Sequence, residues 1–163
     1  MEGFFQFIFF CLLALAVLCF ITYNKVIPLL EDCKSSEANI NTELKRKLDV
    51  YYKFSEMLQS GSAFEKSVFT EITKLRTDAS LTIDEKIYNA RNLIAVAESN
   101  PNVNSVDIYK IYQHQIAETE SRIQQSRELF NDAVNKYNSL VKLFPTNIIC
   151  RILRFTPYAY SLN

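Results

Sequence analysis

Glycine is nearly absent from this chain of 163 residues, which contains only two. Loops that cradle phosphate use several glycines, and all-β folds need them for tight turns, so the composition argues against both. Tryptophan is missing and histidine occurs once, at position 114. We expect His114 to be a solvated surface residue, because no second histidine or cysteine stands at metal-ligand spacing on the same helix.

Cysteine is sparse, and its four copies are scattered. They stand at positions 11, 19, 33 and 150, without a CxxC pair. Two of them lie in a long apolar run, so neither a disulfide framework nor a zinc site is indicated, and free thiols fit a reducing compartment. The sequence therefore predicts no cofactor and no metal.

Net charge is also lacking. Eighteen basic and eighteen acidic residues cancel. A nucleic-acid binder would carry a basic excess, so no nucleic-acid partner is predicted.

What the chain does have is a long apolar run near its start. Thirteen of the residues from Phe4 to Thr22 are Leu, Ile, Phe or Val, and the run continues to Tyr23. Twenty helical residues extend about 30 Å, the thickness of a bilayer core. A cleaved signal peptide would need a basic start and a small-residue cleavage site. Here the start carries Glu2 and no Lys or Arg, and no such cleavage site follows the run. We expect a retained transmembrane helix that contacts lipid through residues 4–23.

The charges around this run predict its orientation. No Lys or Arg precedes it, whereas Lys25 and Lys34 follow closely. The positive-inside rule therefore places the soluble part in the cytoplasm.

The second half of the chain carries one continuous apolar seam between Ser105 and Phe144. Its members recur at alternating steps of three and four residues, which predicts one long helix of the coiled-coil type. They are Tyr109, Tyr112, Ile116, Thr119, Ile123, Ser126, Phe130, Ala133, Tyr137, Leu140 and Phe144. A helix of this length needs partners along its seam, because propensity alone does not keep it folded in water.

The remaining apolar patterns supply those partners. Residues 24–58 keep a similar rhythm, with Glu37 and Lys47 as lapses, and Pro28 marks a point where the helix can bend. Capping-box spacing at Ser62 and at Thr82 predicts two shorter helices. The fold class is therefore all-α: an N-terminal transmembrane helix followed by an antiparallel up-and-down four-helix bundle. The competing topology joins residues 63–99 into one kinked rod.

The predicted domain organisation has three parts. Residues 1–23 form a transmembrane anchor, residues 24–145 form the bundle, and residues 146–163 form a basic and aromatic C-terminal tail.

The long helix also resembles the LemA family. The most specific match is Glu118-Thr119-Glu120-x-Arg122-Ile123-x-x-x-Arg127, which continues through Asn131, Ala133-Val134, Tyr137-Asn138, Phe144-Pro145-x-Asn147 and Phe155-Thr156-Pro157-Tyr158. Looser matches stand at Tyr23-Asn24 and at Ile40-Asn41-x-x-Leu44-Lys45-Arg46. The resemblance implies a bacterial single-pass membrane protein with a four-helix bundle, located in the plasma (inner) membrane, and it implies no enzymatic activity.

The chain departs from the family pattern in three places. Tyr51-Tyr52-Lys53-Phe54 replaces a Leu/Ile-Pro-Asn-Leu stretch, Phe130 stands where the family favours tyrosine, and the glycines usual in the tail are missing. These departures put in doubt any function that the family performs through those positions.

The carboxylates of the long helix do not form a convincing metal site. A di-metal centre in a bundle needs Glu-x-x-His pairs, which the sequence lacks. Glu118 with Arg122, and Asp132 with Lys136, instead have the spacing of ion pairs that stabilise a helix.

A candidate interaction surface is formed by Arg127, Asn131, Asn138 and Asn147. Asn131 and Asn138 follow seam residues one heptad apart, although asparagine is a poor helix former. Such side chains either bond to a neighbouring helix or await a partner, and the sequence leaves both alternatives open.

The tail is a candidate membrane-interface segment through Arg151, Arg154, Phe155 and Tyr158. Apolar residues around two arginines, flanked by aromatic residues, are typical of helices that lie in the bilayer surface. The alternative is that the tail packs along the end of the bundle.

Together these features predict a non-enzymatic, membrane-anchored helical protein that acts as a protein-interaction or scaffolding module. Its protein partners are not identified by the sequence, which also allows a homo-oligomer. The first alternative is a membrane-organising protein whose C-terminal tail contacts lipid, and an enzyme is a remote second.

Overall fold

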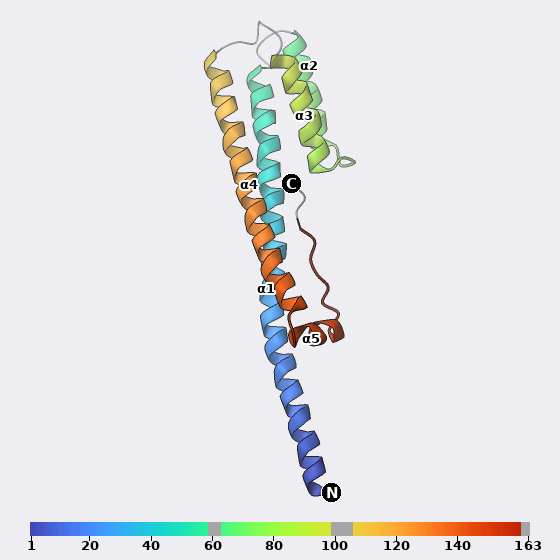
Figure 1. The fold of residues 1–163 in the computed structure, drawn as a ribbon. Coiled ribbons are helices and arrows are strands. Elements are labelled where there is room, and N and C mark those ends of the chain that lie inside the picture. The colour runs from blue at the N-terminus through green and yellow to red at the C-terminus, as the bar shows by residue number, and fades with distance from the viewer. Residues whose placement is uncertain (59–62, 99–105, 161–163) are drawn as a thin grey trace. The chain divides into compact units, whose positions relative to one another are not determined.

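The computed structural model describes residues 1–58, 63–98 and 106–160, whose regular secondary structure is helical, with no strand. The helices are α1 (Glu2–Leu58), α2 (Ala63–Thr77), α3 (Ile83–Glu98), α4 (Val106–Lys142) and α5 (Thr146–Ile152) (Figure 1). The predicted all-α fold class is confirmed. Helix α1 continues through Pro28 as a single element, and Ser62, the predicted cap of α2, lies outside the described residues.

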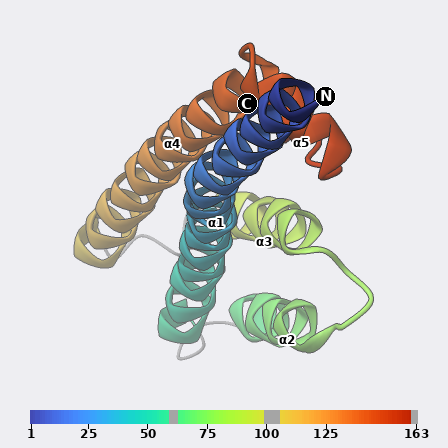
Figure 2. The same cartoon turned by 90° about the horizontal axis from the view of Figure 1, so that it is seen from below.

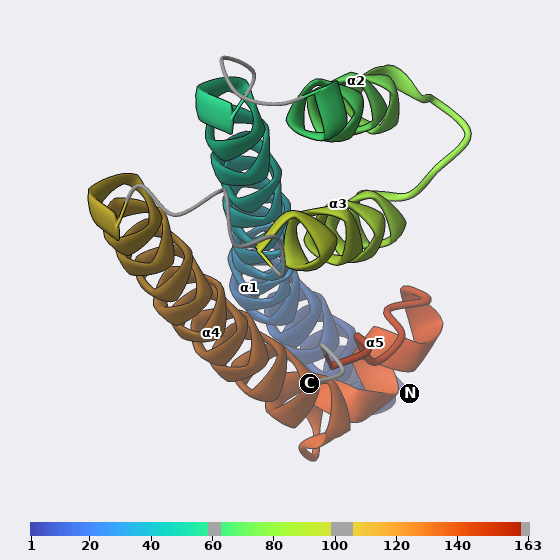
Figure 3. The ribbon, with the colours of Figure 1, turned by 90° about the horizontal axis from the view of Figure 1, so that it is seen from above.

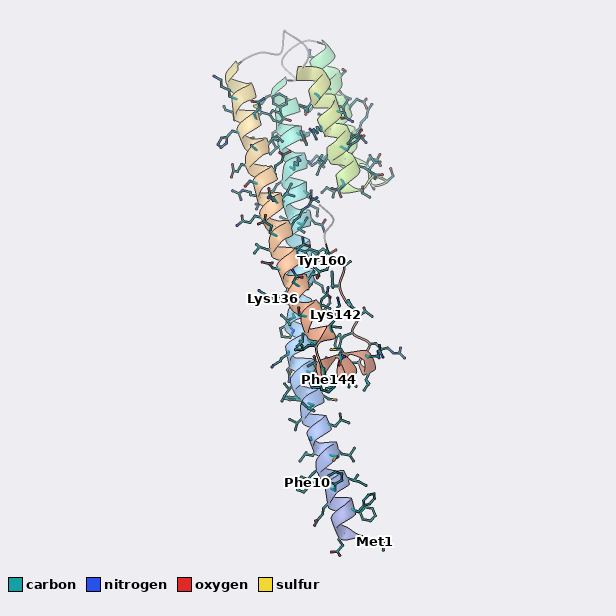
Figure 4. The ribbon with its side chains drawn as sticks, in the orientation of Figure 1. Met1, Phe10, Lys136, Lys142, Phe144 and Tyr160 are labelled. Carbon is teal, nitrogen blue, oxygen red and sulfur yellow. The ribbon has the colours of Figure 1, made fainter. Side chains whose placement is uncertain are left out.

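The first part of α1 is bare. Among the described residues, α1 is the one helix long and apolar enough to cross a membrane, and no residue of its most apolar window is buried. Phe10 stands on this bare stretch (Figure 4). Apolar side chains exposed in an unbroken run fit a lipid environment rather than water.

The chain divides into two compact units. The first contains residues 1–37 and 127–163, and the second contains residues 38–126. Helices α1 and α4 are each divided between the two units, with one segment in each unit.

In the second unit, the segments of α1 and α4 run antiparallel. Lys47 bonds to Glu120 at 3.0 Å, and further along α1 the ring of Phe54 stacks on Tyr112 at a centroid distance of 3.9 Å. Between these two contacts the residue number rises along α1 and falls along α4, so the helices are antiparallel, as in an up-and-down bundle. Lys47, a lapse in the apolar rhythm of α1, therefore serves as an ion-pair partner of α4.

Helices α2 and α3 form a hairpin in the same unit. They lie side by side (Figure 3), and Figures 2 and 3 show the pair on the side of α1 opposite α4. Arg76 of α2 bonds to Asp49 of α1 at 3.0 Å. The single kinked rod over residues 63–99 is thereby ruled out.

The reversal between α2 and α3 follows from local chemistry. The Ser80 backbone N–H donates to the Asp78 carboxylate at 2.8 Å, which closes a turn. The Thr82 N–H then donates to Glu85 at 2.8 Å, and the Glu85 N–H donates back to Thr82 Oγ1 at 3.3 Å. This reciprocal pair is the capping box predicted at Thr82, and it starts α3 as a new helix.

The first unit holds the end of α4, α5 and the tail against residues of α1 (Figure 1). Its core consists of buried side chains from α1, α4 and α5: Val26, Cys33, Phe130, Ala133, Val134, Tyr137, Val141, Ile149 and Cys150.

The predicted seam ends earlier than expected. Phe144 is 75% exposed, because α4 ends at Lys142 and the chain turns there. The helical spacing that would have placed Phe144 on the seam no longer applies beyond that point, so this member of the seam was predicted wrongly.

We expect Phe130→Ala to lower the free energy of unfolding by about 3–5 kcal/mol, because it removes a large buried side chain. Phe130 is 4% exposed, whereas its neighbour Leu129 is 59% exposed. Leu129→Ala is therefore the matched control, with a change below about 0.5 kcal/mol. Urea unfolding of the detergent-solubilised chain, followed by circular dichroism, measures both. Equal effects of the two substitutions would show that the seam is not a core.

Candidate functional site

The first unit contains the candidate site, which begins at the corner between α4 and α5. Pro145 has no backbone N–H and stops α4 from continuing. Thr146 follows, and its hydroxyl donates to the Leu140 carbonyl at 2.6 Å and lies 2.7 Å from the Leu143 carbonyl. Carbonyl groups at the end of α4 therefore find a partner, which fixes where α5 starts.

The end of α5 is closed by two backbone hydrogen bonds. The Phe155 N–H donates to the Cys150 carbonyl at 2.9 Å, and the Arg154 N–H donates to the Arg151 carbonyl at 3.2 Å. This is the Schellman arrangement, which needs one left-handed residue. That residue is Arg154, with φ of 62°. Glycine adopts this conformation without the steric penalty of a Cβ, so an arginine here is locally strained.

Beyond α5 the tail is fastened to α4 by Asn138. The Asn138 side-chain N–H donates to the Tyr158 carbonyl at 2.9 Å, and the Tyr158 N–H donates to Asn138 Oδ1 at 2.8 Å. One amide thus satisfies both backbone groups of one tail residue, as a neighbouring strand would. The Tyr137 hydroxyl donates to the Thr156 carbonyl at 3.0 Å. We call this set of contacts the tail clasp.

Tyr158 completes the clasp with its side chain. Its hydroxyl donates to Glu37 Oε2 of α1 at 2.6 Å, and its ring meets Phe130 edge-on at 6.0 Å. The hydrogen bond to the Glu37 carboxylate raises the pKa of Tyr158 to about 12, with burial as the second cause. Glu37, the other lapse in the apolar rhythm of α1, is therefore a polar contact to the tail.

Two of the thiols of the first unit are buried. Cys33 and Cys150 are fully buried and free. Burial raises the pKa of both thiols, so the nucleophilic thiolate is disfavoured.

A groove of about 660 Å³ is formed by the end of α4, α5 and the start of the tail. Lys142, Arg151 and Arg154 line it together with Val141, Asn147, Ile148, Phe155, Thr156 and Pro157. No carboxylate lines it. Within the described part of the chain, none of its three cations forms an ion pair.

The four residues of the predicted interaction surface do not form one surface. Asn138 is 4% exposed and occupied by the clasp, whereas Asn147 is exposed and lines the groove. Arg127 and Asn131 are half-buried. The Arg127 Nε is buried without a hydrogen-bond partner among the described residues.

The predicted membrane-interface residues also separate into two sets. Arg151 and Arg154 are exposed in the groove. Phe155 and Tyr158 are half-buried, and both contact α1: the Tyr158 hydroxyl bonds to Glu37, and the Phe155 ring meets Tyr23 at a centroid distance of 6.4 Å. Phe155 also lines the groove. The structure brings exposed apolar residues to the outside instead: Leu143, Phe144, Ile148 and Ile152.

The histidine and the carboxylates that the sequence analysis considered on α4 lie on the surface. His114 is exposed. Glu118 pairs with Arg122 at 2.7 Å, and this hydrogen bond lowers the pKa of Glu118. The pair predicted between Asp132 and Lys136 is not formed in the described residues, which also contain no group of three His, Cys, Asp or Glu side chains suited to a metal.

Sequence reasoning missed Glu37, Tyr160 and Asn135 as residues that hold the tail. The Tyr160 hydroxyl donates to Asn135 Oδ1 at 2.8 Å. Only Glu37 carried a signal, since it interrupts an apolar pattern; the other two look like ordinary surface residues.

The long apolar helix and the helical bundle define the class: a membrane-associated helical protein. The chain matches the LemA family over residues 36–161. That match covers most of the chain, so the protein belongs to the LemA family.

Three curated relatives are magnetosome proteins. MamQ 1 and MamQ 2 of Paramagnetospirillum magneticum are each 25% identical to this chain over 173 residues, which cover 85% of this chain and 64% of theirs. MamQ of Magnetospirillum gryphiswaldense is 23% identical over 186 residues, which cover 90% of this chain and 68% of the relative. This chain thus spans about 64% of the length of the first two relatives. None of these names states an enzymatic activity.

We expect Asn138→Leu to release the tail. Leucine has a similar size but cannot bond to Tyr158, and unpaired backbone groups cost about 1–3 kcal/mol. The rate of hydrogen exchange at the Tyr158 amide should rise by the factor that corresponds to this free energy. The control Asn147→Leu, at an exposed asparagine, should leave this rate unchanged. An unaltered Tyr158 amide in Asn138→Leu would contradict the clasp.

We expect the clasp to open at alkaline pH. The folded pKa of Tyr158 lies near 12 and the ordinary value is 10.0, so the stabilisation is fully present below pH 10 and is lost as pH rises through 12. Unfolding midpoints of the wild type and Tyr158→Phe across this range test the expectation. The advantage of the wild type should shrink with rising pH; a constant difference would show that Tyr158 does not titrate as inferred.

Proposed function

We propose that this protein is a non-enzymatic, membrane-anchored interaction module that presents a rigid helical surface to a protein partner. The observation that carries the proposal is an open groove of about 460 Å³ between α1 and α4 in the second unit. Charged side chains of both signs line it: Glu43, Arg46, Asp49, Lys53, Glu118 and Arg122. A groove of this kind suits a polypeptide segment with alternating charge, because complementary charges fix register and exclude wrong partners.

The pairing of these charges argues for recognition rather than catalysis. Arg46 bonds to Glu43 at 2.8 Å, Glu118 bonds to Arg122, and Asp49 bonds to Arg76. A catalytic site needs a nucleophile or base held ready for substrate, whereas these carboxylates keep their charge but are already held by arginines. The family and the names of the relatives likewise describe no reaction.

The proposed location is the bacterial plasma membrane, with the bundle on the cytoplasmic side. Support comes from the bare apolar stretch of α1 and from Lys25 and Lys34 after it. Cys33 and Cys150 are buried and unsuited to labelling; a cysteine at exposed Ser139 is suited to it. A membrane-impermeant maleimide should not label Ser139→Cys in intact cells, and labelling would move the bundle to the other side.

A second function, contact of the C-terminal tail with lipid, has its own support. Phe144 and Ile152 are 75% and 70% exposed at the α4–α5 corner. Figure 4 marks the position of Phe144 at this corner.

Photocrosslinking in intact cells tests the first function. A benzophenone amino acid at Gln115 lies in the charged groove, whereas the same group at Gln113, also exposed on α4, lies outside it. We expect a defined protein adduct from Gln115 and not from Gln113. Arg122→Glu reverses one charge of the groove on an exposed residue and should weaken the adduct with little change in stability.

The same adducts from both positions would contradict a specific groove. So would adducts from Gln115 that Arg122→Glu leaves unchanged.

A further inference from the structure

The tail contacts α1 at the end of its apolar run. Side chains of α1 are exposed as far as Ile21 apart from Cys19, which is half-buried, and Thr22 is only 2% exposed. Phe155 of the tail meets Tyr23, the last residue of the apolar run. Twenty residues from Phe4 to Tyr23 span about 30 Å, so the surface of a bilayer crossed by this run falls at the level of the tail.

Apolar side chains face outward at this level. Phe144 and Ile148 are 75% and 53% exposed, and Ile152 lies one helical turn beyond Ile148 on α5. The opposite side of α5 carries the buried residues Ile149 and Cys150. The helix is therefore apolar on both sides: one side packs on the bundle, and the other has no protein cover within the described residues.

The cations of the groove stand beside these apolar residues. Lys142, Arg151 and Arg154 line the groove without a carboxylate. Arg154 occupies a left-handed position with φ of 62°, where glycine would be less strained. A strained residue with a long cationic side chain fits a binding role better than a purely structural one.

We propose that this groove binds the phosphate of an anionic phospholipid, with Phe144, Ile148 and Ile152 seated at the acyl-chain boundary. The proposal rests on the membrane anchoring and deepens the second proposed function by naming the site and the lipid class. A bilayer is the occupant that explains the observations together. It supplies phosphate for the cations and hydrocarbon for the apolar side, and the adjoining run already spans it.

Selective quenching by lipid tests the proposal on the full chain. The chain has no tryptophan, so Phe144→Trp gives a single fluorescent reporter at the corner. The protein is reconstituted in phosphatidylcholine vesicles that contain a minor fraction of phosphatidylglycerol, with bromine on the chains of one lipid or the other. We expect brominated phosphatidylglycerol to quench more strongly than brominated phosphatidylcholine at equal fraction.

Two substitutions at position 154 separate binding from folding. Arg154→Gly relieves the backbone and should raise the midpoint of thermal unfolding, whereas Arg154→Ala should not. Both should reduce the preference for phosphatidylglycerol by about fivefold, since one cation near an anionic surface contributes about that factor. Lys136→Ala, at an exposed cation of α4 outside the groove, should leave the preference unchanged.

Three outcomes would overturn the proposal. No quenching by either lipid would place the corner away from the bilayer and would also remove the second proposed function, but not the first. Equal quenching by both lipids would keep the lipid contact and reject the anionic site. Loss of the preference on adding inorganic phosphate at matched ionic strength would show that the site takes a free anion rather than a lipid.

Discussion

The structure of the first unit depends on one amide, that of Asn138, which bonds to both backbone groups of Tyr158. An extended tail has no hydrogen bonds of its own, so its polar backbone must be satisfied from outside. Asn138 supplies the hydrogen-bond partners inside the protein, where the low dielectric strengthens a hydrogen bond and makes an unpaired polar group costly. Its poor helix propensity, about 0.6 kcal/mol below alanine, is small beside the penalty of leaving those groups unpaired.

The clasp also links the C-terminal tail to the apolar first part of α1. With Tyr158 fixed on α4 and bonded to Glu37, Phe155 lies against Tyr23 at the end of the apolar run. The basic groove and the exposed apolar side of α5 are consequences of this placement.

The sequence was sufficient for the elements that local periodicity and capping determine. The long helix, the separate α3 and its Thr82 box follow from spacing within one helix or one turn, and the structure contains them. The prediction for Phe144 was wrong because the seam was extended beyond Lys142, where α4 ends. The partner of Asn138 stands 20 residues away across a corner, and no local pattern encodes that distance. Likewise, nothing in the pattern of the tail distinguishes Phe155, which faces α1, from Ile152, which faces outward.

The most direct test of this account is whether the tail lies beside the end of the apolar run of α1. Tyr23→Cys and Phe155→Cys are combined in a chain whose four native cysteines are replaced, and the protein in native membranes is treated with a short, flexible bis-maleimide. The rings of Tyr23 and Phe155 face each other at a centroid distance of 6.4 Å, so the account predicts an intramolecular cross-link in the clasped protein, with a lower yield in Asn138→Leu. A pair that remains unlinked, while each single cysteine stays reactive toward a small thiol reagent, would contradict it.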